Sequence, residues 1–412
     1  MPKATVVRPK YAEKFHCIGP ACEDSCCVGW RVDIDEPTFK KYQSVSPGPL
    51  RVLIDDNIIR TPEGAVGVNL GFANVKLGPS RECPFHNAER LCQIQVDLGE
   101  TFLSPTCANY PRQTYLIEGL VDRTLTLSCP EACRLVLLSP DLIANNAKPV
   151  RHFRWDDSNP ATGLIPYFWP IREFAVNLIR NRAYPLWQRM FLLGTFSRRL
   201  EAVVRGEIKG GFPAILHGFS EALGSENLRA SIETITADLT NQLGMVLELV
   251  QMRAHCALQA PRLAEIIDAF ARGVGYGPET TIESMSTKYG TAYERYFVPF
   301  FEEHPYILEN YLINMIFYKL FPFGAKLFDP RATLEPAKEY ALLATDFALI
   351  KGLLIGVAGA HKEAFSTEHV VQTVQTAFKH FEHNSAFLVK AHQVLVDKNL
   401  NDARGLTMLL RN

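Results

Sequence analysis

The stretch FHCIGPACEDSCCVGW (residues 15–30) places four cysteines within eleven positions, and the last two of them are adjacent. Further cysteines follow before residue 134, so nine of the ten cysteines lie in the first third of the chain. In order along the sequence, these nine are Cys17, Cys22, Cys26, Cys27, Cys83, Cys92, Cys107, Cys129 and Cys133. The fold of this region depends on whether these thiols bind metal, form disulfides or stay free.

The N-terminal sequence MPKATVVRPKYAEKF contains only a short apolar run between charges, well below the ~7–15 apolar residues of a signal-peptide core. We therefore expect a cytoplasmic protein. Reducing thiol pools in the cytoplasm keep structural disulfides from persisting, so a dense cysteine cluster there is more often metal-binding or catalytic. Buried free thiols and disulfides are the alternative.

Thiolates gathered from separated loops are typical ligands of zinc and of iron–sulfur clusters. The sequence lacks the C-x2-C pairs of most zinc sites, which favours an iron–sulfur cluster and leaves zinc open. Cys22 and Cys26 match the start of the C-x3-C-x2-C motif of radical S-adenosylmethionine enzymes. The third position is Gly29, so that motif is absent.

The pattern around the cysteines predicts short strands and loops. Residues 28–34 alternate apolar and polar side chains like a half-buried strand, and residues 114–129 resemble a hairpin that turns at Glu118-Gly119. After a connection at 136–162, apolar residues recur at helical spacing. These predicted helices span 170–179, 185–206, 213–222, 226–257, 262–272, 290–321, 336–358 and 367–396.

We therefore predict an α+β chain with two parts. A small cysteine-rich, metal-bound module with short strands occupies residues 1–140, and a mainly α-helical domain occupies residues 160–412. Lys and Arg (43) nearly balance Asp and Glu (44), which argues against a nucleic-acid partner. The apolar stretch 347–360 contains Lys351 and is shorter than the ~18–20 residues of a membrane span, so we expect none. The sequence does not indicate an oligomeric state.

Three blocks of sequence resemble the flagellin lysine-N-methylase family: FHCIGPACEDSCCVGWRVDID, CPFHNAERLCQIQVDLGETFLSPTCANYPR and LSCPEACR. The middle block also resembles a wider cysteine-cluster family of zinc- or iron-chelating proteins. The specific motifs lie within about residues 15–135. The resemblance implies eight metal ligands, with Cys133 left out: Cys17, Cys22, Cys26, Cys27, Cys83, Cys92, Cys107 and Cys129.

The resemblance also implies an S-adenosylmethionine-dependent enzyme that methylates lysine ε-amines of flagellin and contains an iron–sulfur cluster, with 4Fe-4S favoured. A lysine ammonium has a pKa of about 10.4, so a neutral amine at pH 7 costs about 4.6 kcal/mol. A polar methyltransferase must offset that cost by desolvating the ammonium or with a base, and it needs no metal. The sequence leaves open whether the metal is structural or the methyl transfer follows a radical route.

The sequence identifies neither catalytic residues nor a cofactor site. EGAVGVNLG (63–71) does not match a dinucleotide-binding loop, and the helical part lacks the alternating strands of a Rossmann-like enzyme. Two other functions therefore stay open. One is a non-enzymatic metal-chelating or metal-handling protein, and the other is a helical protein-binding adaptor with a structural metal module.

Several residues near the cysteines have both a functional and a plain structural interpretation. Acids beside Cys22 can attract a substrate lysine or be solvated, a histidine after Cys83 can ligate metal or lie on the surface, and the residues after Cys107 can act on substrate or pack. These candidates are Glu23, Asp24, Trp30, His86, Tyr110 and Arg112. We expect Cys256 to be a small buried apolar side chain and the aromatic residues of 293–312 to be core.

Overall fold

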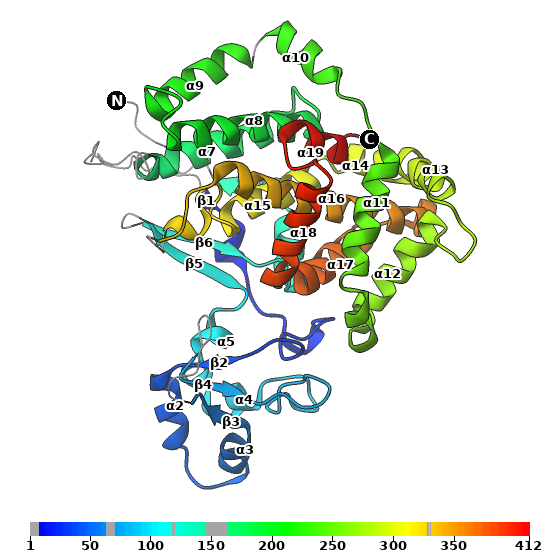
Figure 1. Cartoon of the computed structure of the whole chain (residues 1–412). Helices are drawn as coiled ribbons and strands as arrows, with labels where there is room; N and C mark the ends of the chain where they lie inside the picture. Colours follow the sequence, from blue (N-terminus) through cyan, green and yellow to red (C-terminus); the bar gives the residue numbers. More distant parts are fainter. Residues whose placement is uncertain are drawn as a thin grey trace.

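The computed structural model describes residues 8–62, 71–117, 120–144, 164–223, 225–327, 329 and 331–412. Figure 1 shows a large helical domain and, below it, a smaller lobe formed by an early part of the chain. We call residues 16–109 the cysteine lobe. Helices dominate and the strands are few and short, which confirms the predicted α+β class.

The cysteine lobe is built on a three-stranded antiparallel sheet with the strand order β2-β4-β3. Its apolar core is small, with eight buried side chains among the described residues. The strands are β2 (Asp33–Ile34), β3 (Ile58–Arg60) and β4 (Ala73–Val75), and the helices are α2 (Glu36–Gln43), α3 (Pro49–Asn57), α4 (Gln93–Leu98) and α5 (Pro105–Asn109).

The predicted strand over residues 28–34 is wrong for most of its length. Only Asp33 and Ile34 form a strand, and Val28 makes an isolated bridge to Glu82. Between them, Gly29 has a φ of 97°, a left-handed conformation that interrupts an extended strand. The segment is therefore a shaped loop, which matters because it carries the cysteines.

The predicted hairpin is confirmed: β5 (Arg112–Ile117) pairs antiparallel with β6 (Leu120–Leu125), and the turn itself lies outside the described residues. The hairpin packs into the core of the helical domain, not into that of the cysteine lobe. The same holds for α1 (Tyr11–Lys14), α6 (Pro130–Leu137) and β7 (Ile143–Ala144), and β1 (Arg8–Pro9) pairs antiparallel with β7. The predicted domain limits stay a prediction, because packing alone does not show which segment folds by itself.

A buried ion pair joins the hairpin to the helical domain. Arg172 of α7 binds Asp122 of β6, and both side chains are 1% exposed. The guanidinium also lies over the rings of Phe168, at 4.3 Å, and Phe317, at 4.7 Å. Removing either partner would leave an uncompensated charge in the core, so the pair stabilises the packing of the hairpin against the helices.

The helical domain follows the predicted apolar periodicity, but three predicted long helices are interrupted. Within 226–257 a new helix begins after the N-cap residue Asp238, and within 367–396 a new helix begins after the N-cap residue Asn384. The segment 290–321 is interrupted at His304-Pro305. The helices are α7 (Phe168–Arg180), α8 (Leu186–Val204), α9 (Gly211–Ala222), α10 (Glu226–Glu233), α11 (Leu239–Gln251), α12 (Pro261–Val274), α13 (Ile282–Ala292), α14 (Val298–Glu303), α15 (Tyr306–Tyr318), α16 (Pro336–His361), α17 (Thr367–Ala377), α18 (Ser385–Asp397) and α19 (Ala403–Leu410). Two π-helices, at Tyr293–Phe297 and Phe378–Glu382, extend α13 and α17.

Helix α16 runs through the centre of the helical domain and contacts α8, α11, α12, α13 and α17. It crosses α12 so closely that a Cβ on Gly273 would overlap the backbone carbonyl of Gly356. The helix is long and apolar enough to cross a membrane, so our argument from its shortness is wrong. Its apolar window is 94% buried within the protein, and this burial accounts for its composition.

Candidate functional site

The eight predicted ligand cysteines line two adjoining cavities, one within the cysteine lobe and one between this lobe and residues 110–130. The inner chamber, of about 100 Å³, is lined by Cys26, Cys27, Cys83, Cys92 and Cys107. The outer chamber, of about 330 Å³, is lined by Cys17, Cys22, Cys26, Cys27, Cys92, Cys107 and Cys129. The structure thus brings together thiols from sequence positions more than a hundred residues apart.

The loop of residues 15–30 is held in place by backbone hydrogen bonds to the second cysteine block. The N–H of Cys83 donates to the carbonyl of Cys27 at 2.8 Å, and the N–H of Gly29 donates to the carbonyl of Arg81 at 3.0 Å. The indole of Trp30 donates to the carbonyl of Cys26 at 2.5 Å. These bonds aim the adjacent pair Cys26-Cys27 at the chambers.

Three of the other cysteines lie at the beginnings of short helices. Cys92 is the N-cap of α4 and Cys129 is the N-cap of α6, while Cys107 follows the N-cap Ser104 of α5. Backbone N–H groups of the following residues hydrogen-bond the sulfurs of Cys92 and Cys129 and oppose the rise in their pKa. Such N–H donors favour the thiolate, which is the form that binds metal.

Burial and mutual repulsion hold these thiols protonated while no cation is bound. Burial, with a smaller contribution from neighbouring cysteines, raises the pKa of Cys83 to about 12, that of Cys107 to about 11 and that of Cys129 to about 12. The pKa of Cys26 is also raised, first by its hydrogen bond with Cys27 and then by burial. A bound cation reverses this balance, because metal coordination deprotonates thiols.

The donor set suits a soft metal centre, because sulfur atoms converge with N–H donors behind them. Eight thiols are enough for two centres of four thiolates each. Among the described residues, however, no three His, Cys, Asp or Glu side chains already lie close enough to hold one ion. Ligation therefore requires the thiols to turn toward each other within the chambers, and it stays a prediction.

The two acids of the cysteine loop have partners on other elements. Glu23 pairs with Arg134, and Asp24 accepts two hydrogen bonds from Lys379, each 2.9 Å long. Asp24 also accepts a hydrogen bond from Gln375 at 2.8 Å. These contacts assign both acids to joining the loop to the helices.

The other candidates of the sequence divide between the chambers and the surroundings. His86 pairs with Glu82, Nδ1 to Oε1 at 2.5 Å, and Arg112 donates to the carbonyl of Phe15 at 3.1 Å. Tyr110 lines both chambers, and its ring lies 5.2 Å from that of Trp30.

The other residues singled out in the sequence lie outside the two chambers or outside the described residues. Cys133 is fully buried in the helical core and lines neither chamber. The aromatic segment contributes Phe297, Phe301 and Tyr311 to that core, as predicted. All but Gly71 of the glycine-containing segment 63–71 lies outside the described residues.

The largest of the described cavities, of about 650 Å³, lies beside the chambers and separates the cysteine lobe from the helical domain. At its junction with the outer chamber, the Oγ of Ser128 lies 2.8 Å from Nε2 of His383 and 3.1 Å from the hydroxyl of Tyr110. Burial, together with the charge of Lys379, lowers the pKa of His383 to about 4, so its imidazole is neutral at pH 7. We call this space the interlobe cavity.

Sequence reasoning missed most of the interlobe cavity. Lys379, His380 and His383 come from the π-helix Phe378–Glu382 and the residues just after it. Arg253 comes from the segment after α11. Cys256 lines the cavity too, 3.3 Å from Nε2 of His255; its side chain packs against the helical core but is only half-buried, so the expectation of a buried thiol is met in part.

The helical domain matches a known protein family. Residues 172–409 match the family model described as the FliB lysine N-methylase C-terminal domain. The chain belongs to the FliB lysine N-methylase family. The predicted resemblance is confirmed, and with it the prediction of a protein-lysine N-methyltransferase.

Relatives match the N-terminal part of the chain as well. A lysine-N-methylase of Salmonella typhimurium strain LT2 is 23% identical over 423 aligned residues, which cover 100% of both chains. A flagellar biosynthetic protein FliU of Salmonella muenchen is 36% identical over 150 residues, which are 36% of this chain and 86% of that protein. No solved structure matches the chain.

Proposed function

We propose that this protein methylates lysine side chains of flagellin in the cytoplasm, with S-adenosylmethionine as the methyl donor, and that its cysteines hold an iron–sulfur cluster. Family membership carries the lysine methylation. The relative named as a flagellar biosynthetic protein supports a flagellar substrate. The eight thiols around two adjoining chambers support the cluster.

The net reaction breaks the bond between sulfur and methyl, forms a bond between the lysine nitrogen and methyl, and releases S-adenosylhomocysteine and one proton. When bound, S-adenosylmethionine supplies an electrophilic methyl group. The protein must offer the lysine as a neutral amine, at a cost of about 4.6 kcal/mol at pH 7. We propose that this amine enters the interlobe cavity beside the neutral imidazole of His383, whose Nε2 lies 2.8 Å from the Oγ of Ser128.

The role of the cysteines is tested by anaerobic purification, absorption spectroscopy and measurement of iron, sulfide and zinc. We expect iron and sulfide in the wild type and a clear loss in a Cys107→Ala variant. Cys133→Ala is the matched control, because this thiol is buried in the helical core outside both chambers. Zinc without sulfide would show a zinc site in place of the iron–sulfur cluster, and the absence of both iron and zinc would refute metal binding.

The methylation is tested by incubating the purified protein with S-adenosylmethionine and flagellin and reading peptide masses. We expect methyl-sized mass increases on lysine-containing peptides. Unchanged masses with a fully loaded metal site would favour the metal-handling protein over the enzyme. Unchanged masses with stable flagellin binding would favour the adaptor.

A further inference from the structure

The interlobe cavity is positively charged. Its lining includes four cationic side chains and three histidines, and no Asp or Glu is among the described residues that line it. The cations are Arg31, Arg81, Arg253 and Lys379. A cavity of this size and charge is within the range of small-ligand sites and selects for a negatively charged group.

Two of these cations lack a carboxylate partner among the described residues. Arg31 pairs with Asp33 and Lys379 pairs with Asp24. Arg81 instead donates to the carbonyl of Gly29 at 2.7 Å, and Arg253 donates through Nε to the carbonyl of His380 at 3.0 Å. Each of these two guanidiniums keeps further N–H donors, which suit a planar carboxylate.

Aromatic rings form another wall of the interlobe cavity. Trp30 and Tyr110 both line it, with ring centroids 5.2 Å apart, and both also line the inner cysteine chamber. Their faces offer a surface on which a purine base can stack, at a gain of about 1–3 kcal/mol for one base. The cavity thus joins a site for a carboxylate to a site for a flat base.

We infer that the interlobe cavity binds S-adenosylmethionine, with its carboxylate at Arg81 and Arg253 and its adenine against Trp30 and Tyr110. This inference rests on the proposed function. The sulfonium lies between these two ends of the ligand, where the cationic side chains of the cavity repel it and metal-bound thiolates in the adjoining chambers would attract it. The lysine substrate has no carboxylate, so the arginines do not recognise it.

Calorimetric titration of the full-length protein with two ligands tests the assignment. S-adenosylhomocysteine carries the carboxylate and 5′-methylthioadenosine lacks it, while both carry adenine. We expect Arg253→Gln to raise the Kd for S-adenosylhomocysteine by about 10- to 100-fold and to leave that for 5′-methylthioadenosine unchanged. Trp30→Leu should weaken both ligands by about 5- to 100-fold.

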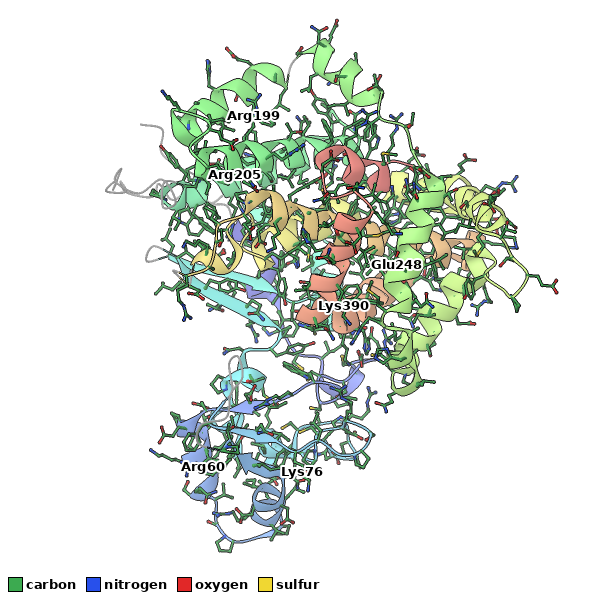
Figure 2. The ribbon with its side chains drawn as sticks, in the orientation of Figure 1. Arg60, Lys76, Arg199, Arg205, Glu248 and Lys390 are labelled. Carbon is green, nitrogen blue, oxygen red and sulfur yellow. The ribbon has the colours of Figure 1, made fainter. Side chains whose placement is uncertain are left out.

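Two further variants guard against a general loss of structure. Arg253→Lys keeps the positive charge and should recover part of the affinity for S-adenosylhomocysteine. Arg205→Gln is the matched control, because this exposed arginine pairs with Glu201 on α8, away from the cysteine lobe (Figure 2). Circular dichroism spectra like that of the wild type show that each variant is folded.

The outcomes separate this inference from the proposed function. Wild-type binding that neither Arg253→Gln nor Arg81→Gln weakens would overturn the inference and leave the proposed function standing. A fully metal-loaded wild type that binds neither ligand nor S-adenosylmethionine would overturn the proposed methyl donor as well. Equal weakening of both ligands by Arg253→Gln would also overturn the inference, because it would show that the arginine does not recognise the carboxylate.

Discussion

The cysteine lobe and the helical domain are stabilised in different ways. The described part of the cysteine lobe buries eight apolar side chains around a small sheet, whereas α16 alone buries most of its length among neighbouring helices. The lobe places its thiols around chambers, and the helical domain fills its centre with packed side chains. From this contrast we expect the stability of the cysteine lobe to depend on the proposed metal and that of the helical domain on the burial of apolar side chains.

Removing the metal is the strongest test of this contrast. Structural zinc contributes about 10–16 kcal/mol to the folding of small metal-binding domains, and we expect a comparable dependence in the cysteine lobe. Chelation should make residues 16–109 sensitive to protease, while the helical domain resists. Limited proteolysis with mass spectrometry reads both parts at once. An unchanged cleavage pattern after complete metal removal would show that the small core suffices.

The buried ion pair at the hairpin should give the next largest effect. Asp122→Ala leaves Arg172 charged and unpaired in the core, which costs about 3–5 kcal/mol of unfolding free energy. Urea unfolding followed by circular dichroism measures the loss. The control is Asp55→Ala, whose exposed pair with Arg51 should contribute less than about 1 kcal/mol. Similar losses in both variants would contradict the assigned role of burial.

The crossing of α12 and α16 tests how tightly the helical domain is packed. Gly273→Ala forces the helices apart, because the new Cβ meets the Gly356 carbonyl, and we expect a loss of about 1–3 kcal/mol. Gly277→Ala is a matched control with no atom within 4 Å of its Cβ. Thermal unfolding of both variants gives the comparison. An unaffected Gly273→Ala would mean that the crossing is looser than described.

The smallest expected effect is a pH dependence at the interlobe cavity. Burial, with nearby positive charges, lowers the pKa of His380 and of His383 to about 4, below the ~6.5 of an unfolded histidine. Between these values the unfolded chain binds protons that the folded chain does not. The contribution of the two buried neutral histidines to the free energy of unfolding is therefore fully present above pH 6.5 and falls as the pH drops toward 4. Water in the cavity screens the effect.

Urea midpoints at pH 7 and pH 5 measure this dependence. A variant with both His380→Gln and His383→Gln should lose less stability between the two pH values than the wild type. His217→Gln, at an exposed position on α9, should behave like the wild type. An equal loss in the double variant would place the acid sensitivity elsewhere in the chain.

Sequence spacing predicted the features that depend on neighbours along the chain. The hairpin, most helices and the grouping of cysteines into three blocks are of this kind. Pro305 and the N-cap residues Asp238 and Asn384 are local signals for the helix breaks that were missed. Arg253 and His383 lie far in sequence from the eight predicted ligand cysteines, and only tertiary packing places them beside the chambers. No local pattern marks them.

The contacts of Asp24 with Gln375 and Lys379 form only after both of these residues have been synthesised. These partners lie 351 and 355 positions after Asp24, so a ribosome makes them long after the cysteine loop. Until then, the loop that carries the first four cysteines lacks its helical wall. The thiols of this loop are thus more accessible to a metal ion before α17 and its π-helix dock than afterwards.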